Sequence, residues 1–279
     1  MQTGLPAITF AGLQYFIAFL CLTLLVLFNP THRNAFRAIS RATWAQLALL
    51  RILFYTITRG AYFIGLTYLP ANTMSLVFNF APVFVALASG LLIKESPSLL
   101  QWFGILLSIT GALVFFLPLE IAAGKTLGFT AGLIGVLAYS ASSLLGRHVN
   151  HKSGLSPILV TTISMGIGGF LLLFVGGITQ GFSRLDLSQW LIIGWLAMVN
   201  TAFAFTIWNN TLRTLSAVEA SIINNTILPQ VAILAWLFLD EPLQAKQILA
   251  ILLVMVGTLV VQLQRHASRD DMAGTEIKS

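Results

Sequence analysis

Long apolar stretches follow one another along this chain and restrict the folds that it can adopt. A helix that spans the hydrocarbon core of a bilayer needs about 20 mostly apolar residues. Nine stretches of the sequence meet that requirement, and most of the turns between them are too short to hold a soluble domain. We expect spans at 7–29, 45–68, 71–93, 98–118, 127–147, 156–178, 188–210, 217–239 and 244–263.

The composition agrees with this pattern and excludes several classes of protein. Apolar residues make up 57% of the 279 residues and charged residues 9%, whereas soluble domains average about 45–50% apolar and about 25% charged residues. The chain is therefore not a soluble enzyme, a disordered chain or a secreted disulfide scaffold. Its single cysteine, Cys21, cannot form an intrachain disulfide. We expect an all-α polytopic membrane protein whose surroundings are the lipid bilayer.

The net charge of +6 is explained by helix orientation and does not require a nucleic-acid partner. Lys and Arg concentrate in the cytoplasmic turns of membrane proteins. Ten of the 15 basic residues fall on one side of the expected spans, namely Arg33, Arg37, Arg41, Lys94, Arg147, Lys152, Arg213, Arg265, Arg269 and Lys278, while Lys125, Arg184 and Lys246 fall on the other. We therefore expect a multi-pass protein of the cell (inner) membrane with a cytoplasmic C-terminus, in which 264–279 form a polar tail.

The sequence also resembles itself when it is shifted by the distance from Asn79 to Asn225, which we call the repeat interval. Residues 91–114 and 237–260 then share 9 of 24 positions. The informative matches are Ser75 with Ser221, Asn79 with Asn225, Glu95 with Glu241, Gln101 with Gln247 and Gly111 with Gly257, and Pro82 lies opposite Pro229 after a one-residue offset.

The two copies are expected to cross the membrane in opposite directions. The charge count places Glu95 on the cytoplasmic side and Glu241 on the external side. Inverted repeats of this kind are common in secondary transporters, where the substrate site lies between the repeats. We expect one repeat of four spans at 1–118 and one of five spans at 127–263. The first repeat therefore lacks its first helix, or the start of the chain is truncated.

Two stretches with these features resemble the EamA-type family of the drug/metabolite transporter (DMT) superfamily. They are 69–82 running on to Glu95, and 215–229 running on to Glu241. Each has a run of small residues, a mid-helix proline, a terminal glutamate and then a glycine-bearing helix. The resemblance implies a carrier of ten helices that moves small metabolites by alternating access. The chain departs from it in having nine expected spans.

Pro82 and Pro229 fall in the middle of expected spans. A proline inside a helix kinks it and leaves the carbonyl four residues earlier without its helical donor. A position that lines a cavity would let water or solute satisfy that carbonyl. A packing kink is the alternative. Polar residues accompany both prolines and are candidates for solute contact or for hydrogen bonds between helices: Asn79, Ser221, Asn224 and Asn225.

Arg59 lies well inside its expected span, far from the outer end. A charge at that depth costs at least about 2.5–3.5 kcal/mol and marks a transport pathway or a paired group. No acid is expected at the same depth, so we interpret Arg59 as a substrate or gating residue, with snorkelling or carbonyl capping as the alternative. Arg51 lies nearer the cytoplasmic end, where a side chain that reaches the membrane surface is the expectation.

Four further candidates complete the expected site. Tyr139, Asn200 and Trp208 present aromatic and amide groups that suit amphipathic solutes, with helix packing as the alternative. Glu219 is the acid closest to the polar residues and is a candidate for proton coupling. An acid near a helix N-terminus is also favourable by itself.

The sequence therefore predicts a secondary transporter of amino acids or related amphipathic solutes, with efflux as the expected direction. A non-transporting or truncated membrane component, or an uptake carrier for a vitamin or nucleoside-like solute, is the alternative. We expect no enzymatic activity, because the spans lack converging His, Asp, Glu and Cys residues. We expect no cofactor and no metal, and a homodimer is one assembly that the sequence leaves open.

Overall fold

The chain folds as a series of membrane-length helices. The structure is a computed structural model that describes residues 7–93, 95–117, 126–182, 185–239 and 243–276. Within these ranges nine helices are long and apolar enough to cross a membrane, and no strand occurs. Their bounds are Ile8–Phe28, Arg41–Tyr68, Thr73–Ile93, Leu99–Phe116, Thr126–Lys152, Pro157–Thr179, Leu187–Thr211, Ala217–Phe238 and Ala245–Leu263. The predicted fold class of a polytopic helical membrane protein is confirmed.

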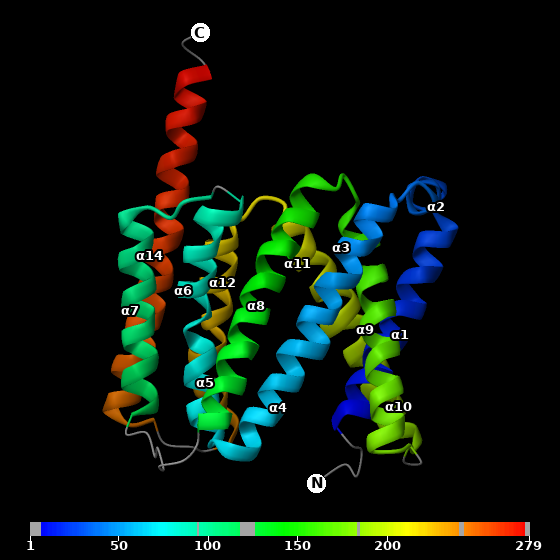
Figure 1. Cartoon of the computed structure of the whole chain (residues 1–279), viewed down its shortest axis with the longest axis horizontal. Coiled ribbons are helices and arrows are strands. Elements are labelled where there is room, and N and C mark those ends of the chain that lie inside the picture. Colours follow the sequence, from blue (N-terminus) through cyan, green and yellow to red (C-terminus); the bar gives the residue numbers. More distant parts are fainter. Residues whose placement is uncertain (1–6, 94, 118–125, 183–184, 240–242, 277–279) are drawn as a thin grey trace. The chain divides into compact units, whose positions relative to one another are not determined.

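Several of these spans are built from more than one helical segment, labelled in Figure 1 where there is room. The α-helices are α1 (Ala7–Phe28), α2 (Pro30–Arg37), α3 (Arg41–Arg51), α4 (Arg59–Tyr68), α5 (Ala71–Asn79), α6 (Ala81–Ala88), α7 (Leu99–Phe116), α8 (Thr126–Lys152), α9 (Pro157–Thr179), α10 (Leu187–Trp195), α11 (Ala204–Thr211), α12 (Ala217–Asn225), α13 (Ile227–Leu239) and α14 (Ala245–Glu276). Three π-helical segments interrupt them: η1 (Ile52–Thr58), η2 (Ser89–Ile93) and η3 (Leu196–Phe203).

Polar residues in the turns set where the helices begin. Ser98, Asp186 and Ser216 each form a capping box with the Gln or Glu three residues later, so α7, α10 and α12 start with their first N–H groups satisfied. The Ser40 hydroxyl accepts from the Thr43 N–H. The second span therefore begins at Arg41, earlier than the predicted residue 45.

Two of the π-helical segments, η1 and η3, lie at related positions of the sequence. Shifted by the repeat interval, η1 would occupy 198–204, which overlaps η3 at Leu196–Phe203. Such segments are rare and are often found at functional sites. Both lie in the middle of a membrane span, between α3 and α4 and between α10 and α11.

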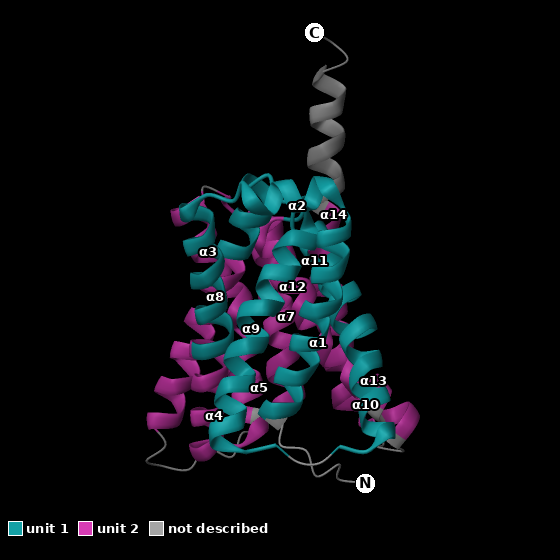
Figure 2. Ribbon diagram, turned by 90° about the vertical axis from the view of Figure 1, so that its right-hand side faces the viewer, with its two compact units in different colours: residues 1–56, 145–215 teal, residues 57–144, 216–279 magenta. Residues whose placement is uncertain are grey.

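The chain forms two compact units, coloured separately in Figure 2. Unit 1 comprises residues 1–56 and 145–215, and unit 2 comprises residues 57–144 and 216–279. Each unit therefore draws segments from both halves of the sequence. Two of the boundaries fall within η1 and α8.

Close contact between α1 and α9 organises unit 1. A Cβ placed on Gly12 would lie 2.7 Å from the backbone nitrogen of Leu173, and one on Gly169 would lie 2.8 Å from that of Phe16. The earlier residue of α1 contacts the later residue of α9, so the two helices are antiparallel. Small residues allow the backbones of membrane helices to approach this closely.

Unit 2 contains a matching antiparallel pair, α7 and α14, which lie side by side in Figure 1. A Cβ on Gly104 would lie 2.6 Å from the carbonyl oxygen of Gly257, and one on Gly111 would lie 2.8 Å from that of Ala250. A shift by the repeat interval converts Gly104 into Ala250 and Gly111 into Gly257, so it maps the first contact onto the second.

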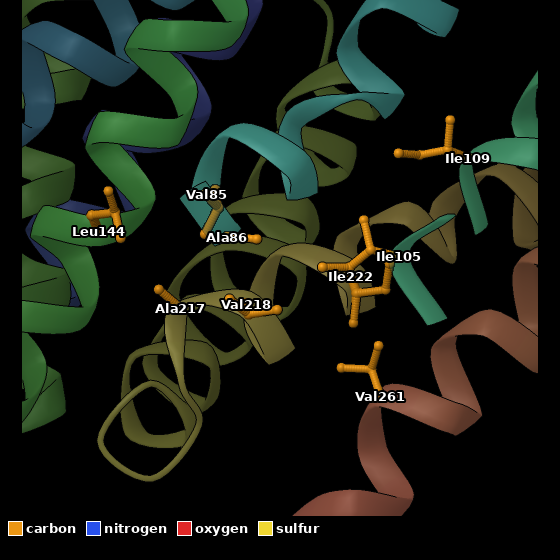
Figure 3. Packing of buried hydrophobic residues seen from close by; sticks show 9 residues of the cluster. All are labelled: Val85, Ala86, Ile105, Ile109, Leu144, Ala217, Val218, Ile222 and Val261. Atoms are coloured by element: carbon orange, nitrogen blue, oxygen red, sulfur yellow. The ribbon is translucent and has the colours of Figure 1, made fainter. Parts of the chain in front are cut away.

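The core of unit 2 forms where α12 meets its neighbours. Figure 3 shows Ile105 of α7, Ile222 of α12 and Val261 of α14 close to one another. Val85 and Val218 belong to the same buried cluster and bring α6 against α12. The C-terminal ends of α5 and α12, at Asn79 and Asn225, belong to this same unit.

Candidate helix-break site

Both proline-bearing spans of unit 2 are broken just before the proline. α5 ends at Asn79 and α6 begins at Ala81, while α12 ends at Asn225 and α13 begins at Ile227. Each break is a tight turn, in which the Phe80 N–H donates to the Val77 carbonyl at 3.2 Å and the Thr226 N–H to the Ile223 carbonyl at 3.0 Å. Phe80 and Thr226 are separated by the repeat interval.

The prolines follow these interruptions directly. Pro82 and Pro229 were expected to kink their spans, and each lies in the first turn of the helical segment after a one-residue interruption at which the backbone stays right-handed helical. The proline there costs no hydrogen bond, because the first N–H groups of a helix have no partner within that helix. Both prolines are buried.

A hydrogen bond joins the two breaks. The Asn225 side chain donates through Nδ2 to the backbone carbonyl of Asn79 at 3.1 Å. The Asn79 side chain is itself occupied by its own helix, because its Nδ2 donates to the Ser75 carbonyl at 2.8 Å. Asn225 is 8% exposed. The buried Ser221 hydroxyl donates to the Val218 carbonyl, so it stabilises α12 locally.

The residue next to this link makes a second polar contact, with α8. The Asn224 Nδ2 donates to the Tyr139 hydroxyl at 2.9 Å. Both side chains are half-buried. Arg59, the first residue of α4, is exposed, and its charge acts on the Tyr139 phenol. We call Arg59, Tyr139 and Asn224, together with the linked Asn79 and Asn225, the break site.

The break site offers a guanidinium group, a phenol hydroxyl and amide groups within one unit. These groups can donate to and accept from the polar part of a small organic solute. The sequence predicts Arg59 as a charge deep in its span, and the structure leaves its side chain uncovered by other helices.

Two other predicted residues lie in unit 1. Asn200 is exposed and belongs to η3, and Trp208 is half-buried in α11. Asn200 therefore lies in the π-helical segment that corresponds to η1 in the repeat. The structure does not place these two residues in the same unit as the break site.

The carboxylate of Glu219 caps its own helix. The Ser216 N–H donates to Glu219 Oε2 at 2.8 Å, and the Glu219 N–H donates to the Ser216 hydroxyl at 3.2 Å. Glu219 is 5% exposed. Glu95 adds a second contact at this end of α12, because its Oε2 accepts from the Ala217 N–H at 3.3 Å. Glu241, its predicted repeat equivalent, lies outside the described residues.

Unit 1 contains buried polar groups that no sequence pattern predicts. Arg147, expected as a charge in a turn, is 8% exposed and donates to the carbonyls of Leu212 and Arg213 at 3.0 and 2.9 Å. The buried Asn209 side chain accepts from Asn150 and donates to the Thr161 hydroxyl. The sequence carries no signal for these contacts, because the partners lie on different helices.

In the part of the chain with described placement, no three His, Cys, Asp or Glu side chains come together as metal ligands. The chemistry of the described site is therefore that of hydrogen bonds, an exposed guanidinium and aromatic rings.

Comparison with known proteins places this chain among transporters. The model of the EamA-like transporter family matches residues 1–117 and 126–263. The uncharacterized transporter YvbV of Bacillus subtilis is 27% identical over 284 residues, covering 98% of this chain and 88% of that protein. The S-adenosylmethionine/S-adenosylhomocysteine transporter of Chlamydia trachomatis serovar L2 is 22% identical over 226 residues, covering 77% and 69%.

The fold also has a counterpart among solved structures. A protein crystal structure matches with a TM-score of 0.75 and 16% sequence identity, covering 94% of this chain and 90% of that chain. At this identity the match shows a shared fold.

Proposed function

The chain belongs to the EamA-like transporter family, and from that premise we propose that it is a secondary carrier that moves small organic metabolites by alternating access. The observation that carries the proposal is the hydrogen-bonded pair of helix breaks in unit 2. Discontinuous helices near the bilayer midplane are typical of the substrate sites of secondary carriers.

Contacts within unit 2 support an inverted repeat. Asn79 meets Asn225, whereas Val85, later in its span, packs in one cluster with Val218, earlier in the other span. Such contacts are expected of two broken spans that run in opposite directions. The antiparallel pair of α7 and α14 follows the same rule, since its glycine contacts exchange under a shift by the repeat interval.

The break site favours an amino acid or a related amphipathic solute. Arg59 can donate to polar oxygens of a solute, and the Tyr139 hydroxyl and Asn224 amide can bind polar groups beside it. The name of the Chlamydia trachomatis relative supports the second candidate, a nucleoside-like solute. The positive charge on one side of the spans supports a cytoplasmic C-terminus in the inner membrane. Efflux is the direction we propose.

Flux into proteoliposomes tests the function and the site together. The purified protein would be reconstituted and screened by counterflow with radiolabelled amino acids, nucleosides and S-adenosylmethionine. We expect Arg59→Ala and Asn224→Ala to lower the flux of the solute that the wild type transports. Arg213→Ala and Asn210→Ala are matched controls, because both residues are exposed and lie outside the break site.

Two results would contradict this proposal. Wild-type protein that moves none of these solutes would contradict the carrier. Flux that stays at the wild-type level in both break-site variants would agree with a carrier but contradict the assignment of the break site.

A further inference from the structure

Unit 1 contains an arginine that the structure buries deeply. Arg51, the last residue of α3, is 7% exposed, although its place in the sequence predicts a side chain that reaches the membrane surface. Among the described residues, its Nε has no hydrogen-bond partner. A buried guanidinium that lacks full hydrogen bonding is costly, so an arginine in this setting needs a function or a partner.

The Arg51 guanidinium lies beside one of a pair of tyrosine rings. The Arg51 Cζ lies 6.0 Å from the centroid of the Tyr55 ring, and the Tyr15 ring meets Tyr55 edge-on at 5.4 Å. Gly168 of α9 makes room for the Tyr55 ring, because a Cβ at that position would overlap it. These residues come from α1, α3, η1 and α9, which all contribute to unit 1.

The site lies at the middle of a membrane span. Gly168 is the central residue of α9, which runs over 23 residues from Pro157 to Thr179. At a rise of about 1.5 Å per residue, a helix of that length crosses a hydrocarbon core of about 30 Å, so its central residue lies near the midplane. Tyr55, packed on Gly168, is therefore near the centre of the bilayer, and Arg51 is one helical turn before it.

The sequence segments of unit 1 offer no acid that could neutralise Arg51. They contain one acidic residue, Asp186, which lies in the turn before α10. The Asp186 carboxylate is occupied there, because Oδ1 accepts from the Gln189 N–H at 2.7 Å and from the Ser188 hydroxyl at 3.0 Å.

A second buried polar atom without a partner lies at the same level. Ser164 is fully buried, and its hydroxyl makes no hydrogen bond to any described residue. Leu47 packs with Leu159 in one buried cluster, and Tyr55 packs on Gly168. The later residue of the second span contacts the later residue of α9, so α3 with the η1 that continues it runs in the same direction as α9. Ser164 precedes Gly168 by one turn, as Arg51 precedes Tyr55, and this register places Ser164 at the level of Arg51.

We propose that Arg51 and Ser164, with the Tyr15–Tyr55 pair, form an anion site in unit 1 that takes the carboxylate of the transported solute. The planar guanidinium suits a carboxylate, and Ser164 adds a hydroxyl donor. The Tyr55 ring holds the guanidinium through a cation–π contact. The identity of the occupant as a solute rests on the proposed function, whereas the anion site itself does not.

Thermal unfolding in detergent tests the site without knowledge of the solute. Wild-type protein would be titrated with sodium acetate, sodium phosphate and sodium chloride at equal ionic strength, and with micelles that contain phosphatidylglycerol. We expect acetate to raise the unfolding midpoint by about 3 °C or more at saturation relative to chloride. Arg51→Gln should abolish that rise, and Arg41→Gln, an exposed arginine of the same helix, should keep it.

The same variants separate an anion site from a structural arginine. Without anion, Arg51→Gln should unfold at the wild-type midpoint or above it, because it removes a buried charge. A lower midpoint without anion would indicate a structural role and overturn the proposal. Ser164→Ala, which removes one hydroxyl, should unfold normally and lower the affinity for acetate several-fold.

The remaining outcomes are also decisive. No rise with acetate in wild-type protein would overturn the site, and a rise with phosphatidylglycerol but not with acetate would assign it to lipid and overturn the solute. If Arg51→Gln fails to fold, a Ser164→Ala variant with unchanged acetate affinity overturns the proposal. A wild type that binds acetate through Arg51 yet shows no flux would contradict the carrier and leave the anion site standing.

Discussion

The Asn225 side chain donates to the backbone carbonyl of Asn79, a residue one repeat interval earlier in the chain. The two residues match one another in the sequence repeat, and each is the last residue of the helix before a break. The bond is one-sided, because the Asn79 side chain donates to Ser75 in its own helix. One asparagine therefore connects the breaks, while its counterpart bonds locally.

This one-sidedness predicts unequal effects of the same substitution. Asn225→Leu keeps the side-chain size and leaves the partly buried Asn79 carbonyl without its donor, which costs about 1–3 kcal/mol. Thermal unfolding in detergent should show a midpoint lowered by several degrees. Asn79→Leu should have a smaller effect, and Asn210→Leu, at an exposed position, should have almost none. Equal losses for Asn79→Leu and Asn225→Leu would contradict the link.

The glycines between α7 and α14 predict a packing effect. A Cβ at Gly257 would lie 2.6 Å from the Gly104 carbonyl oxygen and 2.7 Å from the Ser108 nitrogen, both backbone atoms. Gly257→Ala should therefore destabilise the protein by about 1–3 kcal/mol through overpacking. Gly194→Ala, where nothing lies within 4 Å, should instead stabilise it, by about 0.5–1 kcal/mol. The unfolding midpoints of the two variants should move in opposite directions.

Glu219 allows capping and proton coupling to be separated. Glutamine at the same position can complete the capping box but cannot titrate. If Glu219 serves the helix alone, Glu219→Gln should transport like wild type with and without a pH gradient, while Glu219→Ala should lose stability by about 0.5–2 kcal/mol. Flux in Glu219→Gln that no longer responds to the gradient, with an unchanged unfolding midpoint, would instead assign proton coupling to this carboxylate.

Substitution of Tyr139 should change the affinity of the protein for its solute. Tyr139→Phe keeps the ring and removes the hydroxyl that accepts from Asn224. Loss of one hydrogen bond between this hydroxyl and the solute, of about 0.5–1.5 kcal/mol, corresponds to a rise in the KM for the solute of about 2- to 12-fold. Initial rates in proteoliposomes would measure it. Tyr68→Phe is the matched control, since Tyr68 is 43% exposed at the end of α4. An unchanged KM in Tyr139→Phe would exclude this hydroxyl from the site.

Local sequence was enough to predict the spans and several of the candidate residues. The length of each apolar stretch determines whether it can cross a bilayer, and Ser98, Asp186 and Ser216 mark helix starts through bonds to residues three positions away. Tyr139 and Asn224 were each predicted from the polar face of a single span. Their mutual hydrogen bond could not be predicted, because the two residues lie on helices far apart in the sequence.

The segments that cross the membrane can be predicted from local sequence, because apolar length is a property of a continuous stretch. The sequence also indicated that the proline-bearing spans depart from regular helices. Only the folded structure shows that the regular helices are interrupted at Phe80 and Thr226 and that Arg51 is buried while Arg59 is exposed. Burial depends on the neighbouring helices, which a single stretch of sequence does not specify. Gly168 admits the Tyr55 ring against Arg51, and no pattern within residues 41–68 records that contact.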